Sequence, residues 1–341
     1  MTISGSAAPS SAREVLGAAP ALQKIQEPIR DRLDAVTAEM LDAVTSDAPL
    51  VARMSGHLMA MRGKMLRPTL LLLSSAVEDR PEPRAVKLAA AVELVHLATL
   101  VHDDAVDHSV LRRGMPTLNS LFTHQIAVIM GDFLYSIALA RLVGMSDMDA
   151  LRVLVRASTE MTVGEMRQLG FAEQLSFTEE DYYALIRSKT ASLMSAACEI
   201  GALAGAERYA AALARYGAAL GMAFQIVDDL IDYTEASATT GKPTGQDLRE
   251  HKATLPLIAA MREMPKSARR EVEALFSVSE PADDAVAGVI ELTVAHGGLD
   301  YARARCAEFA VDAERALDTI PETVARTALI DSISYVMERH S

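Results

Sequence analysis

The sequence is poor in the residues that build β-sheets and small cross-linked folds. It has no Trp, only 4% aromatic residues, 18 Gly and 13 Pro among 341 residues. Its two cysteines, Cys198 and Cys306, lie in apolar, helix-like contexts without CxxC spacing. This pattern predicts buried thiols and argues against a disulfide framework or a cysteine metal site. The net charge of −13 argues against general nucleic-acid binding.

Long apolar segments typical of secretion or membrane insertion are also absent from the pattern. Residues 1–20 have no apolar core behind a basic start, so we expect a flexible N-terminal tail and no signal peptide. The most apolar internal run, residues 88–101, is short for a bilayer span and contains Glu93 and His96. We therefore expect a soluble cytoplasmic protein without a transmembrane segment.

Helix-forming residues dominate what is present. Hydrophobic residues make up 50% of the chain, and from Ala21 onward they recur at helical spacing between breaks rich in Gly and Pro. No strand pattern, linker composition or repeat divides the chain. The sequence thus predicts an all-α fold, with residues 21–341 forming one large bundle of ten or more helices around a central apolar cavity.

Two apolar segments that end in carboxylates stand out. Residues 93–107 read ELVHLATLVHDDAVD, and residues 224–233 read FQIVDDLIDY. Residues three and four apart share a helix face. One predicted face therefore carries His96, Thr99, Asp103 and Asp107, and the other carries Gln225, Asp228 and Asp232. Two acidic faces so far apart in sequence are expected to meet.

These carboxylates predict a metal site. An exposed acidic helix end is the plain alternative for Asp103, Asp104 and Asp107 alone, but Asp228, Asp229 and Asp232 repeat both the spacing and the apolar lead-in. Clustered carboxylates repel one another unless cations lie between them. Ligation by oxygen alone favours Mg²⁺ or Mn²⁺, with water and substrate phosphate completing the shell.

Basic residues gather near the same segments. Pro68 suits the first turn of a helix, so Lys64 and Arg67 would lie near the N-terminus of that helix. The helix macrodipole favours binding of an anion there. Arg grips phosphate bidentately and Lys supplies a point charge. Metal ions bound by these carboxylates, together with nearby Lys and Arg side chains, indicate that the ligand is a diphosphate. The polar stretch 235–252 beside the second acidic motif is expected to be a lid. The basic residues are Lys64, Arg67, Arg112, Arg113, Lys189, Lys242 and Lys252.

One spacing favours another chemistry. Glu93-x-x-His96 is the spacing used in helical di-iron carboxylate bundles, but those proteins need two such elements and this chain has one. A di-metal oxidase is therefore a distant alternative. His96 alone also fits a satisfied core residue.

Taken together, these motifs resemble those of the trans-isoprenyl diphosphate synthases, of the long-chain polyprenyl type. They span residues 63–257 in the family's order, and Arg62 departs from it where a second Gly is usual. The matching motifs are Gly63-Lys64-x-x-Arg67-Pro68, Asp103-Asp104-x-x-Asp107, Arg112-Arg113-Gly114, Lys189-Thr190, Phe224-Gln225-x-x-Asp228-Asp229-x-x-Asp232 and Gly241-Lys242 to Lys252-x-Thr254-Leu255-Pro256.

The resemblance implies a role for each group of residues. About three Mg²⁺ ions would be held on an allylic diphosphate by Asp103, Asp107 and Asp228, supported by Asp104, Asp229 and Asp232. The allylic diphosphate would be contacted by Arg112, Lys189, Thr190, Gln225, Lys242 and Lys252. The diphosphate of isopentenyl diphosphate, the nucleophile, would be held by Lys64, Arg67, His96 and Arg113. The departing diphosphate is the expected proton acceptor, so no side-chain base is assigned.

Small residues beneath Asp103 predict a long product. The growing chain must descend along this helix, and Val95, Ala98 and Thr99 lie below Asp103. By resemblance, short-product members of the family carry bulky aromatics at the Ala98 and Thr99 positions. We expect about eight to ten isoprene units, for a quinone side chain. Close helix packing is the alternative role of these small residues.

Two other activities fit part of the pattern. A terpene cyclase would share the bundle and the acidic motifs, but it needs no second diphosphate site. A non-catalytic subunit of a heteromeric synthase would not need intact carboxylates. By resemblance, we expect a homodimer.

Overall fold

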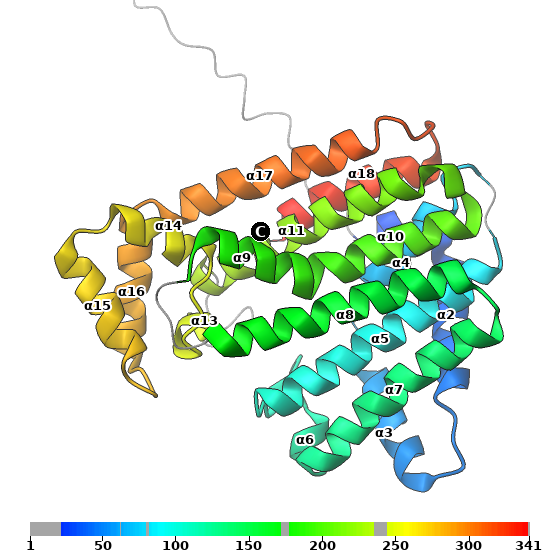
Figure 1. Cartoon of the computed structure of the whole chain (residues 1–341), viewed down its shortest axis with the longest axis horizontal. Helices are drawn as coiled ribbons and strands as arrows, with labels where there is room; N and C mark the ends of the chain where they lie inside the picture. Colours follow the sequence, from blue (N-terminus) through cyan, green and yellow to red (C-terminus); the bar gives the residue numbers. More distant parts are fainter. Residues whose placement is uncertain (1–21, 62, 80–81, 172–176, 235–243, 340–341) are drawn as a thin grey trace, which may run out of the picture.

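The structure is a bundle of long helices. This computed structural model describes residues 22–61, 63–79, 82–171, 177–234 and 244–339. Figure 1 shows α17, α11, α10, α8, α5 and α7 lying in near-parallel rows, with the shorter α15 and α16 at one end. The prediction of an all-α bundle of ten or more helices is confirmed. The predicted N-terminal tail, Arg62, Lys242 and residues 235–243 of the predicted lid lie outside the described residues.

The elements follow one another with short connections. In chain order they are α1 (Leu22–Gln26), η1 (Glu27–Ile29), α2 (Arg30–Ala43), α3 (Pro49–Ala60), α4 (Leu66–Ser75), α5 (Arg84–Val106), β1 (Leu111–Arg112), β2 (Met115–Pro116), α6 (Leu118–Leu121), α7 (His124–Gly144), α8 (Met148–Phe171), α9 (Glu179–Ile186), η2 (Arg187–Ala191), α10 (Ser192–Gly205), η3 (Glu207–Tyr209), α11 (Ala210–Thr234), α13 (Gln246–Arg249), α14 (Leu255–Glu263), α15 (Lys266–Phe276), α16 (Asp283–Ala295), α17 (Gly298–Ala316) and α18 (Val324–Met337).

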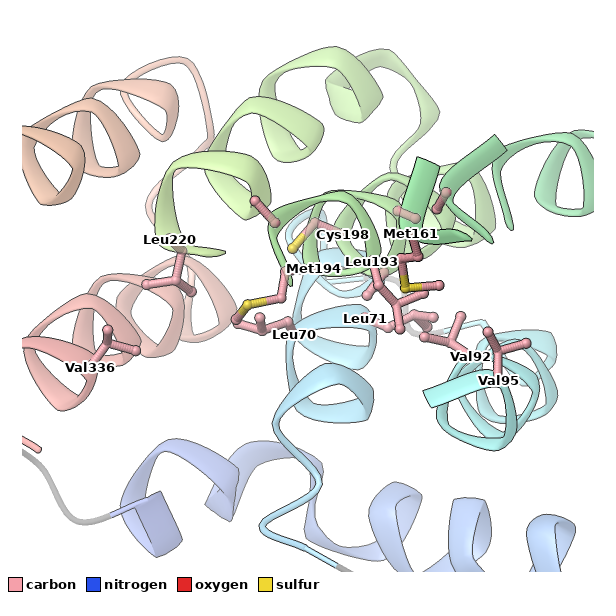
Figure 2. Packing of buried hydrophobic residues seen from close by; sticks show 14 of the residues in the cluster. Leu70, Leu71, Val92, Val95, Met161, Leu193, Met194, Cys198, Leu220 and Val336 are labelled. Atoms are coloured by element: carbon pink, nitrogen blue, oxygen red, sulfur yellow. The ribbon is translucent and has the colours of Figure 1, made fainter. Parts of the chain in front are cut away.

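The core lies where α4, α5, α10 and α11 pack together. Leu70 and Leu71 of α4 are fully buried, and each such side chain contributes roughly 1.5–3 kcal/mol of transfer free energy. Figure 2 shows Leu71 close to Val92 of α5 and Leu193 of α10. This core positions both acidic motifs, because α5 and α11 pass through it and carry the motifs at their polar C-terminal ends.

Close approach between α4 and α10 depends on one glycine. A Cβ atom at Gly201 of α10 would lie 2.9 Å from the Cβ of Ser74 and 3.0 Å from the carbonyl carbon of Leu71. Such contacts are too short for any side chain, so the two helices pack backbone to backbone here. The second half of α4 is thereby fixed against α10, and α4 also packs on α5, which carries the first acidic motif.

A short hairpin departs from the expectation of helices alone. β1 and β2 form an antiparallel pair in which Leu111 faces Pro116 and Arg112 faces Met115. The two loop residues, Arg113 and Gly114, have φ values of 53° and 74°. Two positive φ values are typical of a type I′ turn, whose twist suits a two-residue hairpin loop. Gly adopts this conformation freely, whereas Arg113 is held in it by its surroundings.

Three described helical stretches are long and apolar enough to cross a membrane, judged by length and composition alone: α5, α7 and residues 207–234. The run 88–101, expected to be too short for a span, lies within α5, which has 23 residues. Length therefore does not exclude such a segment. The three stretches differ in burial: 67% of the most apolar part of α5 and 56% of that of residues 207–234 are buried inside the structure, compared with 33% for α7.

Both cysteines are buried as free thiols, as the sequence predicts. Burial raises the pKa of the Cys198 thiol to about 12, and that of Cys306 likewise. A thiol that stays protonated is a poor nucleophile and metal ligand.

Candidate active site

The first acidic motif ends α5. Asp103 and Asp104 lie in its last turn, and Asp107 is the residue that caps it. A helix C-terminus carries partial negative charge, which adds to the repulsion among these carboxylates. Arg112 offsets it, because its Nε donates to both oxygens of Asp104 at 2.8 and 2.9 Å. The β1–β2 hairpin thus delivers a cation to a buried carboxylate.

Asp103 instead faces a cavity. Burial raises the pKa of its carboxyl to about 6, while Lys189 acts in the opposite direction and Glu165 and Asp107 add to the rise. Like charges and removal from water both disfavour the ionised carboxylate. A cation bound in the cavity would restore the ionised form, so Asp103 is suited to cation binding.

The second acidic motif, on α11, has one carboxylate that lines the cavity, Asp228, and two that lie outside its lining and accept hydrogen bonds from the protein. Asp229 is buried and accepts hydrogen bonds from Tyr182 Oη at 2.6 Å and Gln225 Nε2 at 2.9 Å. Asp232 accepts the backbone N–H groups of Gln246 and Asp247, both at 2.9 Å. It thereby caps α13, the described part of the predicted lid. Asp228 is left on the cavity wall.

The two motifs meet across this cavity, which has a volume of about 740 Å³. We call it the acidic cavity. Asp103 of α5 and Asp228 of α11 both line it, and their neighbours Asp104 and Asp229 are hydrogen-bonded by the protein. Other predicted allylic-site residues in its lining are Arg112, Lys189, Thr190 and Gln225.

The donor set fits a hard cation only together with a ligand. Within the described ranges, no three His, Cys, Asp or Glu side chains are close enough to hold a metal ion by themselves. Asp103 and Asp228 offer oxygen atoms from two different helices, and Mg²⁺ binds few protein oxygens while keeping water and phosphate oxygens in its shell. The residues therefore fit a metal that enters with a diphosphate.

Lys189 and Thr190 lie on η2, a π-helical turn that joins α9 to α10. Such turns place an extra residue in a helix and are frequent at functional sites. Lys189 Nζ lies 2.6 Å from Glu165 and donates to Gln168 at 3.1 Å, and Thr190 Oγ1 donates to Gln225 at 2.7 Å. Both side chains are thus oriented at the cavity wall.

A second cavity, of about 570 Å³, adjoins the first. We call it the basic cavity. All four residues predicted to hold isopentenyl diphosphate line it: Lys64, Arg67, His96 and Arg113. The two cavities share Arg67, His96, Arg113, Phe224 and Arg339 in their linings. One helix, α5, therefore serves both.

His96 is a neutral acceptor in the basic cavity. Arg67 Nη1 lies 3.0 Å from His96 Nε2, and since Arg can only donate, Nε2 accepts and Nδ1 carries the proton. Burial and then the charge of Arg67 and Arg113 hold the pKa of His96 well below its usual value. An N–H donor and a buried guanidinium are therefore available to an anion.

Arg113 is positioned by the backbone around it. Its Nη1 donates to the carbonyl oxygen of Met61 at 2.8 Å. A Cβ atom at Gly63 would lie 2.7 Å from the guanidinium carbon of Arg113. The glycine and the hairpin turn together give the guanidinium its place.

The predicted chain-length residues line the acidic cavity below Asp103. Val95 and Ala98 are buried, and the hydroxyl of Thr99 donates to the carbonyl oxygen of His96 at 2.8 Å, so its methyl group is left for packing. Figure 2 shows Val95 on the same side of the packing as Met161 and Leu193, which are also in the lining.

The sequence prediction missed several residues of these cavities. Arg339 follows α18, lines both cavities, reaches Asp228 Oδ1 at 3.3 Å and stacks 4.2 Å from the ring centre of Phe224. Glu165 lies in the acidic cavity, and Tyr335 in the basic one. No local motif marks them, because they reach the site only through packing.

Lys252 was assigned to the allylic diphosphate, but it is not among the residues that line either cavity. Burial acts to lower its pKa, but its pairing with Glu250, followed by the charges of Asp107 and Asp247, raises the pKa above the usual value. Its assignment as a ligand stays a prediction.

Comparison with known proteins agrees with this arrangement. Residues 48–293 match the family model described as polyprenyl synthetase. An all-trans-nonaprenyl-diphosphate synthase (geranyl-diphosphate specific) of Rhodobacter capsulatus is 37% identical over 319 residues, 93% of this chain and 98% of the relative. The octaprenyl diphosphate synthase of Escherichia coli is 35% identical over 326 residues, 93% of this chain and 99% of the relative.

A solved structure has the same fold. The polyprenyl synthase of Caulobacter crescentus, complexed with calcium and isoprenyl diphosphate, superposes with a TM-score of 0.90 at 34% identity, covering 96% of this chain and 100% of that one. Relatives of similar identity differ in product, since a 35% identical protein of Methanothermobacter thermautotrophicus, matched over 92% of this chain and 94% of its own, is a short chain isoprenyl diphosphate synthase.

The fold and its site therefore define an all-α isoprenoid synthase, an enzyme of the prenyltransferase class. The chain belongs to the polyprenyl synthetase family, and its relatives mark it as a trans-isoprenyl diphosphate synthase of long-chain type.

Substitution of Gly63 tests the placement of Arg113. Gly63→Ala should displace the guanidinium while leaving the fold intact, because only the end of a flexible side chain must move. Loss of one charge-assisted hydrogen bond, about 1.5–3 kcal/mol, predicts a KM for the ligand of the basic cavity roughly 10- to 100-fold higher, with kcat little changed.

The matched control is Gly56→Ala in α3, where an added Cβ meets nothing within 4 Å. Steady-state kinetics with isopentenyl diphosphate as the varied substrate provide the measurement. An unchanged KM in the Gly63 variant would contradict the proposed placement.

Proposed function

We propose that this protein condenses isopentenyl diphosphate repeatedly onto an allylic diphosphate primer in the presence of Mg²⁺, giving a long-chain all-trans polyprenyl diphosphate for a quinone side chain. The observation that carries the proposal is that an acidic and a basic cavity adjoin and share Arg67, His96 and Arg113. Two diphosphate groups bound in them would bring an electrophile and a nucleophile together.

The acidic cavity suits loss of diphosphate from the primer. Asp103, Asp107 and Asp228, with Asp104, Asp229 and Asp232 in support, would hold Mg²⁺ ions, which supply charge stabilisation to the leaving diphosphate. Arg112 and Lys189 would add positive charge at the same oxygens, and Thr190 and Gln225 would orient them. Calcium together with isoprenyl diphosphate in the Caulobacter crescentus structure supports this assignment.

The basic cavity suits the nucleophile. Arg67, Arg113 and Lys64 would bind its diphosphate, and His96 would donate from Nδ1. The apolar wall formed by Val95, Ala98 and Leu193 would exclude water from the allylic cation. Attack by the double bond forms the new carbon–carbon bond, and the proton then lost passes to the departed diphosphate.

A cyclase reading is disfavoured by the basic cavity. An enzyme that only ionises one allylic diphosphate has no use for a second anion site that is lined by the half-buried Arg67 and by Arg113. Among the described residues, the cationic side chains that line this cavity are Lys64, Arg67, Arg113 and Arg339.

Removing a carboxylate from either wall tests the metal assignment. Asp103→Ala and Asp228→Ala should each lower the rate of diphosphate release by roughly 100-fold or more, because charge stabilisation of the leaving group is lost. The assay uses Mg²⁺, farnesyl diphosphate and isopentenyl diphosphate, with products identified by mass.

Asp149→Ala, at an exposed carboxylate in the first turn of α8, serves as the control. A near-normal rate for either cavity variant at saturating Mg²⁺ would refute the assignment, and failure of the unmodified protein to extend a primer would refute the function.

Enlarging a residue below Asp103 tests the product length. Thr99→Phe or Ala98→Tyr should shorten the product while turnover of short primers is largely kept, because volume is added below the reacting carbon. Ala98→Ser adds little volume and is the control. Unchanged product masses in both enlarged variants would rule out this wall as the determinant of length.

We also propose a homodimer that forms through α7. This helix is strongly apolar yet mostly outside the core, and Ile129 and Val143 on it are 65% and 59% exposed. Neighbouring α8 exposes Val155 and Met166. Unpaired apolar patches of this kind are typical of subunit interfaces. Sedimentation equilibrium should give twice the chain mass, and Ile129→Asp should shift it toward the monomer, whereas a wild-type monomer would refute the proposal.

A further inference from the structure

Glu93 is a buried acid in the basic cavity. It lies on α5, three residues before His96, and only 3% of it is exposed. Its carboxylate borders the same cavity as Lys64, Arg67 and Arg113. Its Oε2 has no hydrogen-bond partner among the described residues, and neither does the buried Nε of Arg67. A buried acceptor and a buried donor without partners thus belong to two residues that line the same cavity.

Charged and titratable groups face Glu93 from several elements. Arg67 comes from α4, Lys64 from the segment before it, Arg113 from the hairpin turn, and Tyr335 and Arg339 from the end of α18. Glu93 is the one acid among the described residues that line the basic cavity. In the empty cavity its charge is therefore balanced by cations that a diphosphate would also use.

His96 is poorly placed to change its protonation. Its Nε2 already accepts from Arg67, and its pKa lies well below the usual value because of burial and nearby arginines. Glu93 has the opposite tendency, since burial raises its pKa while Arg67 and Arg113 act against that rise. A diphosphate that binds those arginines adds negative charge and further disfavours the ionised carboxylate.

We propose that Glu93 couples diphosphate binding in the basic cavity to the uptake of one proton. The proton comes from solvent and forms an O–H bond at the carboxyl group of Glu93, and no bond in the ligand breaks. The neutral carboxyl group removes a repulsion and becomes a hydrogen-bond donor. This inference rests on the proposed function of the cavity as the isopentenyl diphosphate site.

The sign of the pH dependence follows. Between the pKa of Glu93 in the free protein and its higher pKa in the complex, the complex holds one more proton. Affinity therefore falls as pH rises through that window, by up to tenfold per pH unit. Without a titrating group at position 93, this component of the pH dependence is absent.

The test is calorimetric titration of the full chain with isopentenyl diphosphate in buffers of different ionisation enthalpy, at several pH values. The wild type should take up more protons than Glu93→Gln, by up to one per site, and its affinity should depend more steeply on pH. Comparing the two cancels protonation of the ligand itself. Glu39→Gln, at a glutamate in a different cavity between α2, α5 and α7, should behave as the wild type.

The following results would overturn the proposal for Glu93. Equal proton uptake in the wild type and Glu93→Gln would give Glu93 only a structural role. Uptake kept in Glu93→Gln but lost in His96→Gln would assign the proton to His96. If Glu93→Gln does not fold, the wild type still decides: a binding enthalpy that does not change with the buffer, together with an affinity that does not change with pH, overturns the proposal. Absence of binding by the wild type would instead refute the function proposed for the cavity.

Discussion

The structure depends on how carboxylates are accommodated at the ends of two buried helices. α5 and α11 pass through the core and end in three acids each, which repel one another and lose hydration. Arg112 neutralises Asp104, Tyr182 and Gln225 hydrogen-bond Asp229, and Asp232 caps α13. Asp103 and Asp228 line the acidic cavity, where Arg339 reaches Asp228. Each motif thus divides into a part that holds the fold together and a part available to a ligand.

In the basic cavity the groups that need partners are cations instead of carboxylates. Arg67 is half-buried, and removal from water lowers the pKa of both Arg67 and Arg113, so each guanidinium needs a pairing or hydrogen-bonding partner. Glu93, His96 and the carbonyl oxygen of Met61 meet part of this need. Arg67 Nε still lacks a partner among the described residues. Cations that are incompletely paired bind an added anion more favourably. Condensation of two diphosphate substrates requires such an anion site.

Much of the site could be predicted because its residues lie on regular elements. On a helix, spacing alone decides which side chains share a face, so Asp103 could be grouped with Thr99 and His96 and Asp228 with Gln225. Burial was likewise readable from the apolar run before each motif. Family order then grouped Lys64, Arg67 and Arg113 with His96, and the structure brings these four to one cavity.

The sequence by itself determined the features that follow from helical periodicity: the helices, their apolar faces and the two acidic helix ends. What only the tertiary structure decided is which groups are left unpaired. Arg339, Glu165 and Tyr335 enter the cavities from distant helices, and the φ of Arg113 arises in a hairpin that no strand pattern announced. The physical reason is that pairing of charges depends on distances between elements, whereas helical periodicity depends only on positions within one.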